Sequence, residues 1–128
     1  MQTVTLEQFM TFDPCWEESD ILTITGDKTE WNALEVLAVD SVSAEDRLWV
    51  VLREEFLPAE ILHEFACRCA EKALALVDNP DPRSVAAIDA KRKWLRGEIT
   101  DSARDAAWAA ARDAQAQMLA DLIAEAAP

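Results

Sequence analysis

The sequence predicts an all-α fold, a compact multi-helix bundle that forms a single domain over residues 1–128. Alanine, the strongest helix former, is abundant, whereas two glycines and no tyrosine argue against long β-hairpins. Apolar residues recur at helical spacing along most of the chain, and capping residues and prolines separate the helical segments. With 128 residues, about half of them apolar, the chain suits one domain with a hydrophobic core.

Residues 1–42 are predicted to be an acidic helical segment that packs on a helical core formed by residues 43–128. The run Thr5-Leu-Glu-Gln8 matches a capping box, in which a hydroxyl and a glutamine side chain bond reciprocally to the backbone. It predicts a short helix that ends near Thr11, because the following Asp13-Pro14 breaks helical structure.

The segment from Trp16 to Thr25 is compatible with two structures. Acidic residues at its start and Gly26 at its end favour a helix, whereas the β-branched residues of Ile21–Thr25 favour a short strand. The helix is the preferred interpretation.

The next run, Asp27-Lys-Thr-Glu30, is a second capping signal. The helix that it predicts carries apolar residues at helical spacing: Trp31, Leu34, Leu37 and Ala38.

A helix over residues 44–55 is predicted to begin after Ser43, with acidic residues in its first turn. A central helix follows at once over residues 58–77, because Pro58 suits a first helical position. Its apolar residues cover an arc of roughly 220°, wider than the stripe of a surface helix, which predicts a core helix with neighbours on several sides. These residues are Ile61, Leu62, Phe65, Ala66, Cys69, Ala70, Ala73, Leu74, Leu76 and Val77.

A third core element is predicted as a helix over residues 82–96. Asp81 suits its N-cap and Pro82 its first helical position, and Gly97 suits its C-terminal cap. One face of this helix carries a stripe of residues at helical spacing: Ala87, Ile88, Lys91, Trp94 and Leu95.

The last predicted element is a long alanine-rich helix over residues 100–126, capped by Thr100. The tetrapeptide Ala-Arg-Asp-Ala occurs in it twice, at 103–106 and at 111–114. The small side chains of this repeat predict close approach to a neighbouring helix. One side of the helix is more apolar and carries Trp108, Ala111, Gln115, Met118, Leu119, Leu122 and Ile123.

The negative charge lies almost entirely in the first half of the chain. Residues 1–60 contain 14 acidic and three basic residues, whereas residues 61–128 contain 11 and nine, within a total of −13. Such a charge repels nucleic acid and membrane surfaces and attracts basic proteins, although solubility alone is the simpler explanation. The absence of an apolar run of about 18 residues and of a signal sequence predicts a cytoplasmic protein.

The sequence also resembles a known family over most of its length. The run Phe65-Ala-Cys-Arg-Cys-Ala-Glu71, followed by NPDPRSVAAIDAKRKWLRGE at 79–98, resembles the immunity protein family of small helical bacterial and prophage proteins. The segments around Pro14-Cys-Trp16, Thr29-Glu-Trp31 and Asp46-Arg-Leu-Trp49 are similar to its longer prophage-borne members. The resemblance implies a non-enzymatic protein that neutralises a toxin by binding it, and it supplies no binding residues.

No arrangement of residues predicts catalysis or a cofactor. Cys15, His63, Cys67 and Cys69 are the only His and Cys residues, and they match the number of ligands in a zinc site. However, Cys67 and Cys69 lie about 160° apart on a helix, so the preferred interpretation is Cys69 in the core and His63 at a helix edge. Neither a nucleophile elbow nor a phosphate-binding glycine loop is present. The prediction is a non-enzyme without metal or cofactor.

The basic run Lys91–Arg96 suits phosphate contacts, with Trp94 to stack on a base. The preferred interpretation is a helix end whose cations compensate the helix dipole. Trp31, Trp49, Trp94 and Trp108 occupy positions that suit a core, whereas Trp16 is the best candidate for partial exposure.

The leading hypothesis is a protein that occludes a basic partner, a toxin or a host nuclease, after electrostatic steering. The predicted contact residues are Trp16 as an aromatic anchor with Glu17, Glu18, Asp20, Glu30, Glu54 and Glu55. A second hypothesis is a prophage-borne mimic of nucleic acid that inhibits a host nuclease or DNA-binding protein. A third is a structural module that oligomerises through the alanine-rich final helix.

Overall fold

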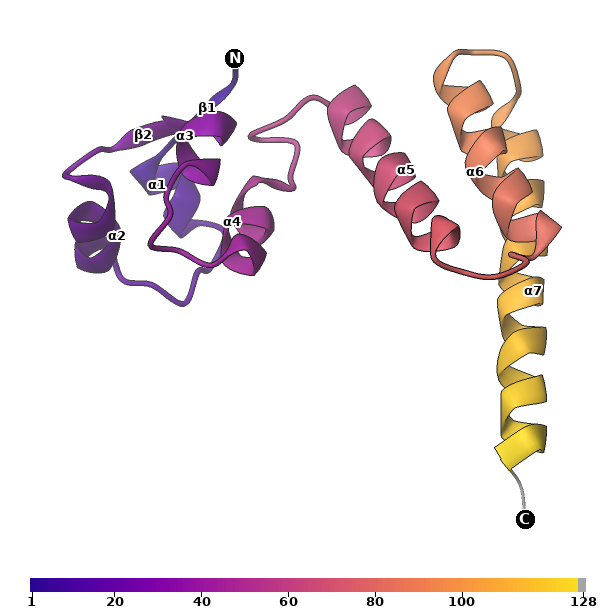
Figure 1. The fold of residues 1–128 in the computed structure, drawn as a ribbon. Coiled ribbons are helices and arrows are strands. Elements are labelled where there is room, and N and C mark those ends of the chain that lie inside the picture. The colour runs from indigo at the N-terminus through magenta and orange to yellow at the C-terminus, as the bar shows by residue number, and fades with distance from the viewer. Residues whose placement is uncertain (127–128) are drawn as a thin grey trace. The chain divides into compact units, whose positions relative to one another are not determined.

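The computed structural model describes residues 1–126 and confirms the all-α fold class. These residues form seven helices and one small two-stranded sheet (Figure 1). The chain divides into two compact units, residues 1–62 and residues 63–128, called here the N-terminal unit and the C-terminal unit. The packing of residues 1–128 as one domain stays a prediction.

The N-terminal unit is built from short elements around a two-stranded antiparallel sheet. Its elements are β1 (Thr3–Thr5), α1 (Leu6–Met10), α2 (Glu18–Thr25), β2 (Glu30–Asn32), α3 (Ala33–Leu37) and α4 (Ala44–Val51). In the sheet, Val4 lies opposite Trp31, and both side chains are buried. The small sheet therefore joins the beginning of the chain to the segment that follows α2.

Local capping fixes the first two helices as the sequence predicts. At α1, the Thr5 hydroxyl accepts from the Gln8 backbone N–H at 3.2 Å, and the Gln8 side chain accepts from the Thr5 N–H at 2.9 Å. The ambiguous segment forms the helix α2, which ends at Gly26 with φ +66°, a conformation that favours glycine. The preference for a helix over a strand at 21–25 is confirmed.

The helix predicted after Asp27 begins later than expected. Glu30–Asn32 is a strand, and α3 starts at Ala33 behind a capping box in which Asn32 accepts from the Glu35 N–H at 2.9 Å. The prediction was wrong because two capping patterns lie five residues apart. Pairing of Trp31 with Val4 extends the backbone at the first pattern, so that only the second can open a helix.

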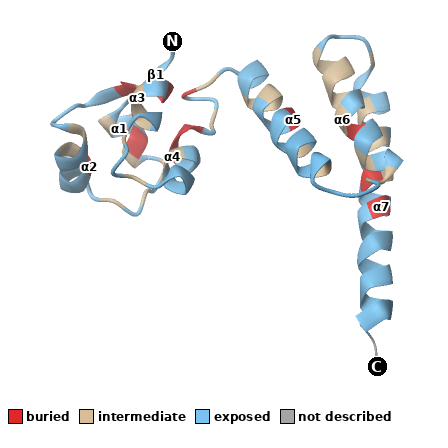
Figure 2. Cartoon of the chain, viewed as in Figure 1, coloured by how far each residue is buried: buried red, intermediate tan, exposed pale blue. Residues whose placement is uncertain are grey.

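The core of the N-terminal unit is formed by residues from nearly every element, drawn in red in Figure 2. It consists of Val4, Phe9, Ile21, Trp31, Ala33, Val50, Val51 and Phe56. The predicted helix over 44–55 starts as expected after Ser43 but ends at Val51, because Leu52 leaves helical geometry at ψ +64°. The early end lets the chain turn back and bury Phe56, which is 1% exposed.

Over its described residues, 63–126, the C-terminal unit contains helices and no strand. They are α5 (Ala59–Ala75), whose first residues belong to the N-terminal unit, α6 (Pro82–Leu95) and α7 (Asp101–Ala126). The predicted caps are confirmed: Asp81 accepts from the Arg83 N–H at 2.8 Å, and Thr100 accepts from the Ala103 N–H at 3.2 Å. Gly97 follows α6 with φ +73°, as expected of its C-terminal cap.

Helices α6 and α7 lie side by side and pack through small side chains (Figure 1). Ala87 of α6 and Ala111 and Ala114 of α7 are buried, and both alanines of α7 come from the second copy of the repeated tetrapeptide. The predicted long alanine-rich helix is confirmed. Burial of alanines at this contact agrees with the expected close approach of two helices.

The central helix forms, but its predicted apolar arc is largely exposed. Ile61 and Phe65 are exposed, and Cys69, expected in the core, is exposed while Cys67 is buried. The prediction of the buried face was wrong because an ion-pair network selects a different one. Arg92 of α6 binds the carboxylates of two α5 residues, Glu64 at 2.8 Å and Glu71.

The predicted core positions of the tryptophans are only partly confirmed. Trp31 is buried at 5% exposure and Trp94 is half-buried, whereas Trp49 is 44% and Trp108 36% exposed. The expectation fails for Trp49 because α4 buries the adjacent Val50 and Val51 instead. It fails for Trp108 because α7 packs through its alanines.

The ion pairs of the C-terminal unit predict a stability that depends on pH. Hydrogen bonds from Arg68 and Arg92 lower the pKa of Glu64, and one from Arg96 lowers the pKa of Glu98. A carboxyl with a lowered folded pKa stabilises the fold above its unfolded pKa of about 4.3, and this contribution disappears as the pH falls through the folded value. Chemical unfolding of the wild type at pH 7, 4 and 3 should show this loss.

Arg92→Gln provides the comparison for this pH dependence. The variant should lose less stability than the wild type between pH 7 and pH 3, because part of the pairing is already absent. Lys91→Gln is the matched control, since Lys91 makes no ion pair with any residue that the structure describes. Equal pH dependence in Arg92→Gln and the wild type would show that the network does not contribute.

Candidate functional site

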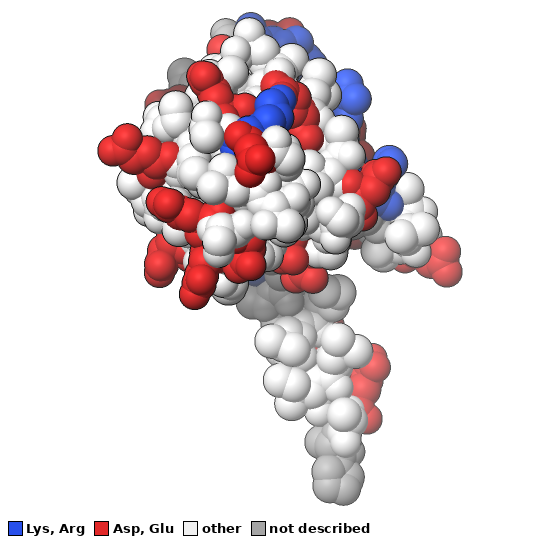
Figure 3. Space-filling view, turned by 90° about the vertical axis from the view of Figure 1, so that its left-hand side faces the viewer, with Lys and Arg blue, Asp and Glu red and all other residues white. Residues whose placement is uncertain are grey.

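The N-terminal unit carries an excess of carboxylates that has no counterpart elsewhere in the chain. Residues 1–62 contain 14 acidic and three basic residues, a net charge of −11. Figure 3 shows red acidic side chains spread over one face of the molecule, with few blue ones among them. The charge is therefore a property of the surface of this unit.

The three basic residues of this unit neutralise little of its charge. Lys28 pairs with Glu35, the only ion pair among residues 1–62, all of which the structure describes. The Arg53 guanidinium lies 4.1 Å from the Phe12 ring centroid and donates to the Trp49 carbonyl at 2.9 Å. Arg47 donates to a backbone carbonyl. Thirteen carboxylates of this unit thus remain without an ion-pair partner.

The C-terminal unit uses its charges differently. Seven ion pairs join residues of the described range 63–126, including the Arg92 network and the pair of Arg96 with Glu98 at 3.0 Å. Its acidic and basic residues are nearly balanced, 11 against nine. Any attraction for a basic partner must therefore come mainly from the N-terminal unit.

The predicted contact residues fall into two groups in the N-terminal unit. The first group begins α2, where Glu17 and Asp20 form a capping box and Glu18 is exposed. Trp16 precedes them and is half-buried, as expected of a partly exposed anchor. Its ring stacks on that of Phe9, with the centroids 6.4 Å apart.

The second group lies beside the beginning of the chain. Thr3 donates to the Glu30 carboxylate at 2.5 Å, and Gln2 donates to the Glu54 backbone carbonyl at 2.8 Å. Because Gln2 and Thr3 are neighbours, these bonds hold Glu30 near the 54–55 segment. Glu54 and Glu55 are both exposed. The structure shows a hydrogen-bonded link within this group and none between the two groups.

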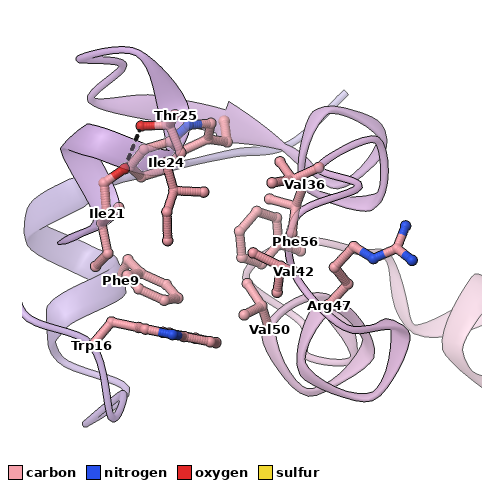
Figure 4. A pocket seen from close by; sticks show the side chains of 12 residues that line it. Phe9, Trp16, Ile21, Ile24, Thr25, Val36, Val42, Arg47, Val50 and Phe56 are labelled. Atoms are coloured by element: carbon pink, nitrogen blue, oxygen red, sulfur yellow. Dashed lines mark hydrogen bonds between the residues drawn. The ribbon is translucent and has the colours of Figure 1, made fainter.

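An apolar pocket lies inside the N-terminal unit, with a volume of about 70 Å³. It is a gap between two walls of side chains, shown in Figure 4. One wall, from α1, α2 and the turn between them, consists of Phe9, Trp16, Ile21 and Ile24, and the other consists of Val36, Val42, Val50 and Phe56. The predicted anchor Trp16 is thus part of a concave apolar site.

The surface of this pocket is apolar, although residues with polar groups contribute to its lining. The aliphatic part of Arg47 lies along one wall, and its guanidinium points away from the gap in Figure 4. Trp31 also lines the pocket, and its indole N–H is buried without an acceptor among the described residues. Because this N–H is buried and the surface of the pocket is apolar, it offers no hydrogen bond to an occupant.

The His and Cys residues are placed separately. His63 lies edge-on to the ring of Trp94, with centroids 5.5 Å apart, and the three cysteines are free thiols. Among residues 1–126, the structure places no three His, Cys, Asp or Glu side chains where they could hold one metal ion. Within the same range, none of the helices has the length and apolar character needed to cross a bilayer.

The basic run at the end of α6 is engaged within the C-terminal unit. Arg92, Lys93 and Arg96 pair with carboxylates. Trp94 donates from its indole N–H to Asp101 at 2.6 Å, and the Arg104 guanidinium lies 4.1 Å from its ring centroid. These contacts agree with a structural role of the run in joining α6 to its neighbours.

Comparison with known proteins returns no match to a family model, a curated protein or a solved structure. The resemblance to the immunity protein family therefore stays an expectation.

Sequence reasoning missed most of the pocket. Its walls combine residues from Phe9 to Phe56, and none of the short elements shows by itself that it borders a cavity. The signal that could be read was Trp16, an aromatic residue beside an acidic run.

Proposed function

We propose that this chain is a non-enzymatic binding protein that occludes a basic protein partner, as a toxin-neutralising immunity protein does. The observation that carries the proposal is the set of thirteen carboxylates in residues 1–62 without an ion-pair partner. Such a surface speeds encounter with a positively charged protein and disfavours acidic ones. A cytoplasmic location stays part of this proposal.

The matched test compares two triple variants with the same change in net charge. Glu18→Gln, Glu54→Gln and Glu55→Gln remove three charges of the N-terminal unit whose carboxylates make no ion pair with any residue that the structure describes. Asp78→Asn, Asp113→Asn and Glu125→Gln remove three charges of the C-terminal unit. The partner is first isolated from host lysate at low salt, and its affinity for each variant is then measured with purified proteins.

The first triple variant should bind the partner roughly tenfold more weakly at low salt, because each exposed charge pair contributes modestly. The second triple variant should bind like the wild type. Equal weakening in both variants would mean that only the total charge matters. An unchanged affinity in the first variant would contradict the proposal.

A nucleic-acid mimic is the second candidate, since the same unpaired carboxylates can stand in for phosphates. Competition separates the two candidates. A partner that is released from this chain by duplex DNA would favour the mimic. A basic partner that stays bound in excess DNA would favour occlusion of a toxin.

The end of α7 favours self-association as a third candidate. Met118, Leu119, Leu122 and Ile123 are each more than half exposed and lie together along the helix. Sedimentation velocity should then show a fraction of dimer that rises with protein concentration. The double variant Leu119→Gln with Leu122→Gln should show no dimer. A wild type that stays monomeric at the highest concentration would contradict self-association.

A further inference from the structure

The pocket of the N-terminal unit has the size of a single aliphatic side chain. A dry cavity of about 150 Å³ in another protein holds benzene. The pocket here is about half as large, about 70 Å³, and partly open to solvent. The end of a leucine, isoleucine or valine side chain fits such a volume, whereas a cofactor-sized ligand does not.

The pocket lies in a unit whose surface is strongly acidic. No carboxylate lines the pocket itself, and Arg47 is its one charged lining residue. A second hollow, which shares Trp31 and Val39 with the first, is lined by Asp40 and by the ion pair of Glu35 with Lys28. The whole unit carries a net charge of −11. An apolar site on an acidic surface complements an apolar side chain flanked by cations.

We propose that the pocket receives an aliphatic side chain of the basic partner, from a segment in which Lys or Arg flank that side chain. The proposal rests on the proposed function and names the part of the partner that this chain recognises. Trp16 and Ile24, which line the pocket on the side of α2, would contact the inserted side chain. The unpaired carboxylates of the N-terminal unit would attract the flanking cations.

Two capped peptides test this proposal with the full chain. One is acetyl-Lys-Lys-Leu-Lys-Lys-amide, and the other carries Ala in place of Leu. Binding is followed at low salt by the proton and nitrogen shifts of the indole N–H groups, assigned by single Trp→Phe variants. The leucine peptide should bind roughly five- to tenfold more tightly and shift the signals of Trp16 and Trp31 most, because it buries more apolar area.

A cavity-filling variant provides the second arm. Val42→Phe places a ring in the pocket and should abolish the preference for leucine over alanine while the protein stays folded. Val77→Phe is the matched control, since Val77 is an exposed valine of the C-terminal unit. It should leave the preference unchanged.

Each outcome has a distinct meaning. Equal binding of both peptides, weakened by salt, would overturn the pocket proposal while leaving charge-driven binding intact. No binding of either peptide at low salt would count against the pocket and against the proposed function together. If uncharged 3-methyl-1-butanol shifts Trp31 as strongly as the leucine peptide, the pocket would belong to a small apolar ligand, and the proposal would be wrong.

Discussion

Replacing Phe56 by alanine is expected to lower the free energy of unfolding of the N-terminal unit by about 3–5 kcal/mol. Phe56 is 1% exposed and is the largest fully buried side chain of the described residues. At about 0.05–0.15 kcal/mol per residue, a unit of 62 residues has about 3–9 kcal/mol in total. The substitution should therefore remove a large part of its stability, which urea unfolding followed by tryptophan fluorescence measures.

Leu34→Ala is the control for this prediction. Leu34 is 63% exposed in α3 of the same unit, so its truncation should change the free energy of unfolding by less than about 1 kcal/mol. If Phe56→Ala lowers the free energy of unfolding as little as Leu34→Ala does, Phe56 is not packed in the core as the structure describes.

The second large effect is expected where α6 and α7 meet. Ala111→Leu should destabilise the C-terminal unit by about 1–3 kcal/mol, because Ala111 is buried and the added methyl groups must force the helices apart. The helical propensities of alanine and leucine are close, so the backbone contributes little to the difference. Thermal unfolding followed by circular dichroism at 222 nm measures it.

Ala116→Leu makes the same chemical change on an exposed position of α7. It should leave the melting temperature nearly unchanged. If both variants unfold at the temperature of the wild type, the contact between α6 and α7 is looser than the burial of Ala87 and Ala111 indicates.

The sequence predicts the helices well where their ends depend on local hydrogen bonds. Thr5, Ser43, Asp81 and Thr100 each cap a helix where expected, since a cap needs only residues within one turn. Prediction fails where a residue far away in the sequence determines the local structure. The strand at Trp31 depends on Val4, 27 residues away.

The buried face of α5 is another feature that depends on a residue far away in the sequence. Hydrophobic periodicity ranks the face with Phe65 and Cys69 highest, yet Arg92 binds the opposite side through Glu64 and Glu71. Charge pairs across helices leave no periodic signal in one sequence. For this reason the pattern can predict a helix and still assign its buried face wrongly.

The acidic charge of the candidate site could be predicted from the sequence, but its pocket could not. Counting residues is enough to find the acidic excess of the N-terminal unit. The pocket, however, needs Phe9 and Phe56 on facing sides, and their approach depends on how the short elements between them turn. The placement of Trp16 against Phe9 is likewise a product of the tertiary fold.

The most direct test of the account is the salt dependence of partner affinity for the wild type and for a sixfold variant. The variant neutralises Glu17, Glu18, Asp20, Glu30, Glu54 and Glu55. Binding to the isolated partner is measured between 50 mM and 500 mM NaCl by calorimetry, with circular dichroism to verify that the variant is folded. Wild-type affinity is expected to fall steeply with salt, whereas the variant is expected to bind weakly at every salt concentration. Equal affinity and equal salt dependence of the two proteins would contradict it.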